Sequence, residues 1–137
     1  MSSAEAEVLA ANQAFYDAFA RGDMVVLEAL WAEKAAVACI HPGWDALVGR
    51  DEVLQSFRSI LGGGGAPAVK CLRPTATVMG EAAFVVCAEA LGDVELVATN
   101  LFVQEGGCWR LVHHHSGPVH RRTERRPPPA PSGSMLN

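Results

Sequence analysis

The stretch TNLFVQEGGCWRLVHHHSGPV, from Thr99 to Val119, carries the pattern that decides the fold. Its centre, Glu105-Gly106-Gly107, is a turn signal between two runs rich in apolar residues. Glycines at such positions supply the backbone freedom that a tight hairpin loop requires. The stretch therefore predicts two antiparallel strands, with three consecutive histidines, His113 to His115, near the end of the second strand.

The pattern continues backwards from this hairpin. Turn signals at Gly80-Glu81 and Gly92-Asp93 separate earlier runs with strand-like alternation. Because short turns join neighbouring antiparallel strands, the second half of the chain predicts a meander. The predicted strands are Val69–Met79, Ala82–Leu91, Val94–Gln104 and Cys108–His115.

The first half of the chain has helical spacing instead. Ser2 and Glu5 have the spacing of a capping box for a helix that ends before Gly22, and Asp23 is typical of the cap of a second helix. Helices followed by a run of strands favour an α+β fold, with three N-terminal helices packed against a bent antiparallel sheet. The predicted elements here are helices over Ser2–Arg21, from Met24 to Trp31 and over Arg50–Leu61, and a buried strand over Ala35–Ile40.

Composition indicates one globular domain. The chain has 137 residues, of which 50% are hydrophobic and 19% charged. We expect the domain to span residues 1–120 and residues 121–137, rich in arginine and proline, to form a flexible tail. A docking role of this basic tail for an acidic partner is a weaker alternative. Without the tail the body has seven basic and fourteen acidic residues, a balance that disfavours nucleic acid as a partner.

The chain shows no sign of membrane insertion or of a disulfide framework. No apolar stretch approaches the length of a membrane span, and the N-terminus lacks a basic signal-peptide region. The four cysteines show no paired CxxC spacing, which favours reduced thiols. We expect a soluble cytoplasmic protein.

Three stretches together resemble the SnoaL-like members of the NTF2-like superfamily: residues 6–32, residues 39–57 and residues 99–119. The resemblance covers about residues 5 to 119. It implies a cone-shaped domain, in which a strongly curved antiparallel sheet wraps around the helices, leaves a pocket and forms a homodimer. It implies no single activity, because the superfamily includes isomerases, dehydratases, cyclases, hydrolases and non-catalytic association modules.

The last hairpin also predicts which side chains share a face. With the loop centred on Gly106-Gly107, Gln104 lies opposite Trp109 and Asn100 opposite His113. Alternation then divides the three histidines between two faces, so they cannot converge on one metal ion, and we expect no metal or cofactor. His114 is expected to face a second subunit or solvent. The predicted pocket face carries Asn100, Phe102, Trp109, Leu111, His113 and His115.

A second candidate segment is HPGW, from His41 to Trp44. Ketosteroid-isomerase-like members of the superfamily have a carboxylate base before a proline at the corresponding strand end, and a tyrosine on the first helix. The matching positions here are His41 and Tyr16. The resemblance thus implies that His41 transfers a proton and Tyr16 polarises a substrate oxygen, with His113 or Asn100 as a second donor, since the last strands hold no suitable acid. Alternatively, His41 caps the strand and Trp44 fills the core.

Two functions are compatible with these residues. The first is a small-molecule-binding domain with a hydrophobic pocket, in which proton transfer, elimination or cyclisation acts on a carbonyl-bearing metabolite. The second is a non-catalytic homodimeric association module whose cone is filled by tryptophans. For the first function the predicted catalytic residues are His41, Tyr16 and His113, and the predicted ligand-binding residues are Trp44, Asn100, Trp31, His115, Trp109 and Phe102.

Overall fold

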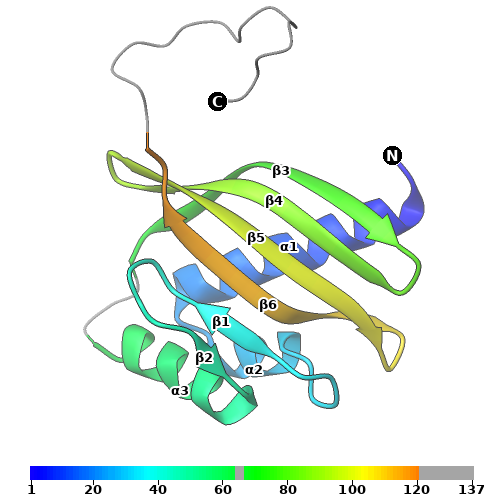
Figure 1. Ribbon diagram of the computed structural model, residues 1–137, viewed down its shortest axis with the longest axis horizontal. Coiled ribbons are helices and arrows are strands. Elements are labelled where there is room, and N and C mark those ends of the chain that lie inside the picture. Colours follow the sequence, from blue (N-terminus) through cyan, green and yellow to red (C-terminus); the bar gives the residue numbers. More distant parts are fainter. Residues whose placement is uncertain (64–66, 121–137) are drawn as a thin grey trace, which may run out of the picture.

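A computed structural model describes residues 1–63 and 67–120 of the chain (Figure 1). Residues 64–66, within the predicted glycine link, and the predicted tail at 121–137 lie outside the described residues. The helices are α1 (Ser3–Arg21), α2 (Met24–Leu30) and α3 (Arg50–Leu61). The strands are β1 (Ala38–Ile40), β2 (Leu47–Val48), β3 (Val69–Met79), β4 (Ala82–Leu91), β5 (Val94–Glu105) and β6 (Cys108–Pro118).

Local signals position the first two helices as the sequence predicts. The Ser2 hydroxyl accepts a hydrogen bond from the Glu5 amide at 3.1 Å, and the Ser2 amide donates to the Glu5 carboxylate at 2.8 Å, which completes the capping box. Gly22 ends α1 in the left-handed region, with φ of 66°. Asp23 then accepts a hydrogen bond from the Val26 amide and caps α2.

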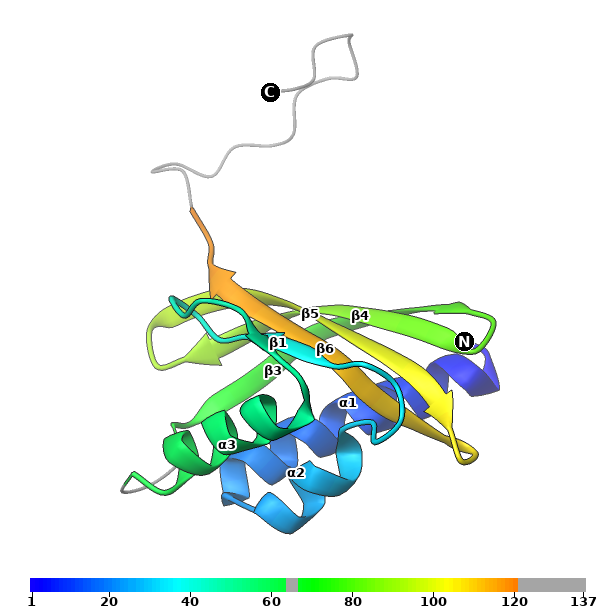
Figure 2. The ribbon, with the colours of Figure 1, turned by 60° about the horizontal axis from the view of Figure 1, so that its bottom comes forward.

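The strands form one sheet in the order β2-β1-β6-β5-β4-β3. Each pair is antiparallel except β1 with β6, which is parallel. The three helices of the described residues all lie on one side of this curved sheet (Figure 2). The observed α+β fold matches the predicted one; the two-residue strand β2 was not predicted, and β1 is shorter than the predicted strand 35–40.

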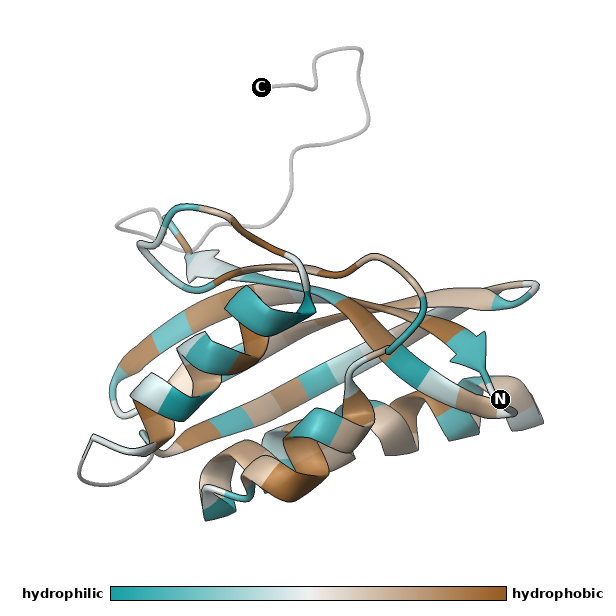
Figure 3. Ribbon diagram, turned by 90° about the horizontal axis from the view of Figure 1, so that it is seen from below, coloured by the Kyte–Doolittle hydropathy of each residue, from teal (hydrophilic) through white to brown (hydrophobic). Residues whose placement is uncertain are grey.

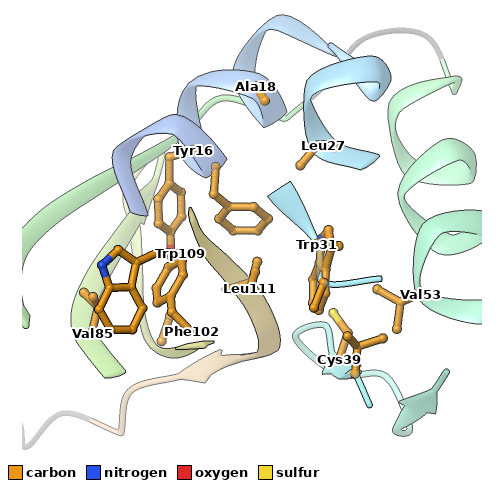
Figure 4. Close-up of a cluster of buried hydrophobic side chains, with 14 of the residues drawn as sticks. Tyr16, Ala18, Leu27, Trp31, Cys39, Val53, Val85, Phe102, Trp109 and Leu111 are labelled. Carbon is orange, nitrogen blue, oxygen red and sulfur yellow. The ribbon is translucent and has the colours of Figure 1, made fainter. Parts of the chain in front are cut away.

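The core lies between the helices and the inner face of the sheet (Figure 4). Buried and more exposed residues alternate along β4 and β5, so each of these strands presents one face to the helices. Figure 3 shows hydrophobic and hydrophilic residues along the strands of the sheet. Trp31 is fully buried, and Phe102 and Trp109 are 2% and 7% exposed. Burying aromatic side chains of this size stabilises a fold by about 2–3 kcal/mol each. The large residues of the core therefore come from both halves of the chain.

A β-bulge in β6 changes which histidine faces the helices. Phe102 pairs with Leu111, but Leu101 pairs with His113, so β6 holds one extra residue, Val112, at this point. Beyond the bulge, Asn100 pairs with His114. The predicted pairing of Asn100 with His113 is therefore wrong. The prediction assumed a regular hairpin, and the extra residue Val112 shifts the register by one and exchanges the two faces of β6 beyond it.

Candidate functional site

The inner side of the sheet and the helices enclose a cavity of about 250 Å³. Most of its wall is apolar and includes the aromatic rings of Phe15, Phe19, Phe57, Trp44 and Tyr16. The polar groups at its wall come from four elements or their ends, and they are Tyr16 on α1, His41 after β1, Glu89 on β4 and His114 on β6. Such an apolar cavity with a few convergent polar groups is typical of a small-molecule site.

The structure brings together only some of the residues that the sequence singled out. Tyr16, His41 and Trp44 line the cavity. Trp44 is also 45% exposed to solvent. Asn100 is fully buried and contacts the wall residue Tyr16 through a hydrogen bond. Trp31, Phe102 and Trp109 do not line this cavity and belong to the core described above.

The two histidines predicted for the pocket face, His113 and His115, also do not line the cavity. His113 is half-buried and its Nδ1 lies 3.0 Å from the carbonyl oxygen of Ala38, while His115 is exposed. His114, predicted for the opposite face, is 5% exposed and lines the cavity. The physical reason is the bulge at Val112, which exchanges the faces of all residues beyond it.

Sequence reasoning missed Glu89, the carboxylate of the cavity wall. It lies on β4 and is 4% exposed, so the sequence-based expectation that the strands supply no suitable acid to the pocket was wrong. The signal was present in the strand AAFVVCAEAL, because Glu89 stands in phase with the buried side chains of Ala83, Val85 and Cys87. A carboxylate in the inward phase of an apolar strand needs hydrogen-bond partners, and marks a candidate functional group.

Two hydroxyl groups donate hydrogen bonds to Glu89. Tyr16 Oη lies 2.6 Å from Oε2, and Ser116 Oγ lies 2.5 Å from Oε1. In both contacts the hydroxyl group donates and the carboxylate oxygen accepts. The pKa of Tyr16 is raised well above its usual value, first by burial and then by the charge of Glu89, so Tyr16 remains a phenol that donates its proton.

The orientation of Asn100 follows from this donation. Because the Tyr16 hydroxyl gives its hydrogen to Glu89, its oxygen accepts from Asn100 Nδ2 at 3.1 Å. The same amide nitrogen donates to Asn12 Oδ1 at 2.8 Å. Asn100 Oδ1 is thereby turned to His114 Nδ1, 2.5 Å away, and must accept a hydrogen from it. The network thus fixes the proton of His114 on Nδ1.

His114 is a neutral imidazole whose second nitrogen carries a lone pair. Burial lowers the pKa of His114 to about 3, with smaller contributions from neighbouring histidines. With Nδ1 protonated, Nε2 is the acceptor, and it lies 3.9 Å from Glu89 Oε2. The ring of Phe15 packs against the imidazole with 5.1 Å between ring centroids.

His41 has the opposite tautomer. Ser56 Oγ lies 2.7 Å from the carbonyl oxygen of Val53, which only accepts, so the serine hydrogen points there. His41 Nε2, 2.8 Å from Ser56 Oγ, must then donate, which leaves the lone pair on Nδ1. Burial lowers the pKa of His41 to about 4 and keeps this imidazole neutral as well.

The two imidazoles lie on one wall region, with 6.3 Å between their ring centroids. The rings of Phe57 and Trp44 each pack edge-on against His41, with 4.9 Å between centroids. The site can therefore accept protons or hydrogen bonds inside an aromatic environment. Within residues 1–63 and 67–120, no group of three or more histidines, cysteines or acidic residues is arranged to hold a metal ion. No helix in these ranges is both long and apolar enough to cross a membrane.

Comparison with known proteins establishes the family. A model of the SnoaL-like domain matches residues 8–120, so the chain belongs to the SnoaL-like domain family. Its fold is the NTF2-like, cystatin-like cone. No protein of curated function matches the chain.

Solved structures show the same fold at different levels of identity. A candidate dehydratase of the NTF2-like family from Streptomyces avermitilis is 34% identical with a TM-score of 0.78, covering 87% of this chain and 98% of its own. A candidate calcium/calmodulin-dependent protein kinase type II association domain from Thiobacillus denitrificans is 32% identical with a TM-score of 0.65, covering 81% and 94%. The CaMKII hub from S. rosetta is 18% identical with a TM-score of 0.69, covering 87% and 99%, and shares the fold.

Proposed function

We propose that the cavity binds a small, mainly apolar molecule and that the polar wall moves a proton on it. The observation that carries this proposal is the placement of two neutral imidazoles and one buried carboxylate on the wall of an aromatic cavity. An aromatic wall supplies affinity for an apolar skeleton, and a few fixed polar groups set its orientation. A water-poor site also strengthens electrostatic interactions with the bound molecule.

The proton-accepting groups define the class of reaction. His41 has a lone pair on Nδ1, which lies 3.9 Å from the Cys39 sulfur, and Glu89 and His114 offer further acceptors. Positioned groups of this kind abstract a proton in isomerisation or elimination. Elimination from a hydroxylated carbonyl compound is the reaction we favour, and the 34% identity to a candidate dehydratase supports it. In the oxyanion-donor role, Tyr16 has to exchange its hydrogen bond to Glu89 for one to the substrate oxygen.

A second candidate function is homodimeric association through the sheet. On the outer face, Val86, Val97 and Leu101 are 40%, 45% and 36% exposed. Exposed apolar residues on neighbouring strands are typical of a protein interface. The similarity to an association domain at 32% identity supports the same proposal. The outer face and the inner cavity are separate, so association and ligand binding are compatible.

A thermal-shift screen of the full chain tests the ligand-binding function. The panel consists of small apolar ketones, alcohols, amines and carboxylates, each measured on the wild type, on His41→Ala and on His115→Ala. A ligand at 100 times its dissociation constant adds about 2.7 kcal/mol to stability, which is a shift of a few degrees. We expect hits whose shift is reduced by His41→Ala and kept by His115→Ala, because His115 is exposed outside the cavity. A panel without hits on the folded protein would overturn the proposal.

A further inference from the structure

Four side chains of the cavity wall, those of Tyr16, His41, Glu89 and His114, offer hydrogen-bond acceptors rather than donors. Within the described residues, each donor hydrogen assigned above to these side chains points to a protein acceptor. The lone pairs of these side chains are therefore what a ligand in the cavity can bind. Tyr16 and Ser116 donate to Glu89, and His114 Nδ1 donates to Asn100. His41 Nε2 donates to Ser56. A ligand that forms hydrogen bonds with Tyr16, His41, Glu89 or His114 must therefore bring its own donor hydrogens.

Two of these acceptors lie close together without a hydrogen between them. His114 Nε2 and Glu89 Oε2 are 3.9 Å apart, and both side chains are at least 93% buried. The burial that keeps His114 neutral leaves its lone pair beside a carboxylate oxygen. A donor atom from the cavity relieves this arrangement, since it can give one hydrogen to each acceptor.

The separation of the two acceptors favours a nitrogen with at least two hydrogens. Two hydrogen bonds of about 2.8 Å to atoms 3.9 Å apart meet at roughly 90° at the donor. A primary ammonium has three hydrogens and accommodates such an angle. An alcohol has one hydroxyl hydrogen and serves one acceptor at a time, and a ketone has no donor.

The charge and the aromatic lining of the cavity select a cation. Glu89 is the acidic residue of the wall, and none of the described lining residues is a lysine or arginine. The aromatic side chains of Phe15, Phe19, Phe57 and Trp44 line the same space. Aromatic side chains attract an ammonium through their ring quadrupoles, and a buried carboxylate adds an opposite charge.

We propose that the cavity binds a small primary amine in its ammonium form, which donates hydrogen bonds to Glu89 Oε2 and His114 Nε2 while its apolar part lies among the aromatic side chains. This inference rests on the proposed ligand-binding function and adds an ammonium group to the hydroxylated carbonyl compound favoured there. It leaves His41 free to act as the base on a carbon of the bound molecule.

Isothermal titration of the full chain with four probes of similar size tests the inference. The probes are benzylamine, benzyl alcohol, acetophenone and benzoate. We expect benzylamine to bind at least about tenfold more tightly than benzyl alcohol, because only the amine satisfies both acceptors and the charge. Benzoate is expected not to bind, because its negatively charged carboxylate would be repelled by the carboxylate of Glu89.

Two variants locate the effect. Glu89→Gln keeps the size of the side chain but removes its charge, and we expect it to remove the preference for benzylamine. Glu81→Gln changes an exposed carboxylate in the turn before the same strand, and is expected to bind benzylamine like the wild type. Should Glu89→Gln fail to fold, the side-chain nitrogen signals of His114 in the wild type report the contact, and benzylamine must shift them more than those of His115.

The outcomes separate this inference from the proposed function. If benzyl alcohol or acetophenone binds as tightly as benzylamine, the amine proposal is wrong while ligand binding in the cavity stands. If benzylamine binds but shifts His115 rather than His114, the amine occupies another site and the proposal is also wrong. If none of the four probes binds, the amine proposal fails, and the panel of ketones, alcohols, amines and carboxylates decides whether the cavity binds ligands at all.

Discussion

Asn100 on β5 lies directly opposite His114 on β6, and a hydrogen bond of 2.5 Å joins Asn100 Oδ1 to His114 Nδ1. The pair links a fully buried amide of the sheet to an imidazole at the cavity wall. Through Tyr16, the same amide is connected to Glu89 on the neighbouring strand. Asn100 is thus hydrogen-bonded to two residues of the candidate site, His114 and Tyr16.

Replacing Asn100 by leucine is expected to destabilise the protein by about 2–4 kcal/mol. The change leaves buried polar atoms of Asn12, Tyr16 and His114 without their partner, and an unpaired buried group costs about 1–3 kcal/mol. Urea denaturation measures the difference. Thr99→Val, on the outer face next to Asn100, is the control and should change stability by less than about 0.5 kcal/mol. Equal effects of both variants would contradict the network.

Stability is expected to fall as the pH is lowered from 7 to 4. The pKa values of His41 and His114 are lowered to about 4 and about 3, below the value of about 6.5 in an unfolded chain. Within this window the unfolded chain binds more protons than the folded one, so acidification favours unfolding, and the loss ends once the pH is below the folded pKa values. Glu89 and Asn100 face His114, Ser56 and Cys39 face His41, and the two imidazole rings face each other.

Melting temperatures at pH 7, 6, 5 and 4 test this dependence. His114→Gln should show a shallower decline than the wild type, because the variant has one buried imidazole fewer to protonate on unfolding. His115→Ala should keep the wild-type decline, since His115 is exposed. Identical slopes for wild type and His114→Gln would show that His114 is not a buried neutral imidazole.

The outer face of the sheet is expected to join two copies of the chain. Val97→Glu places a charge at the centre of the exposed apolar residues of β4 and β5, and burying that charge in an interface is unfavourable. We expect the variant to be monomeric by light scattering after size exclusion, while the wild type is dimeric. Glu81→Gln, away from this face, should remain dimeric. A monomeric wild type would remove the dimer proposal.

Trp44 is expected to matter for binding more than for stability. It is 45% exposed, and its ring packs on His41 beside the cavity. Trp44→Ala should therefore change the unfolding free energy by no more than about 1 kcal/mol and reduce the thermal shift of every cavity ligand. Val48→Ala, at another exposed position, should leave both unchanged. A full ligand-induced shift in Trp44→Ala would place the ligand elsewhere.

The sequence predicts the elements well because their signals are local. The capping box at Ser2, the cap at Asp23 and the turn at Gly106-Gly107 each depend on residues within one turn of chain. The bounds of α3 and β4 follow from periodicity in the same way. These features require no knowledge of the rest of the fold.

The polar site depends on contacts between distant residues, and for this reason only part of it was predicted. The bulge at Val112 lies where β6 pairs with β5 on one side and β1 on the other, and no glycine, proline or other turn residue in the sequence marks it. One extra residue was enough to exchange His113 for His114. Glu89 was visible as a carboxylate in the inward phase of β4, but its partners Tyr16 and Ser116 are 73 and 27 residues away in the chain.

The most direct measurement is a long-range proton–nitrogen spectrum of the histidine side chains at pH 7. The hydrogen bonds of the two cavity histidines predict opposite neutral tautomers, with the proton on Nδ1 in His114 and on Nε2 in His41. His115, which is exposed and does not line the cavity, serves as the internal reference. Two neutral rings with these tautomers would support an acceptor-lined ligand site. A charged His114, or a proton on its Nε2, would contradict it, because the cavity would then already hold the donor that a ligand is expected to supply.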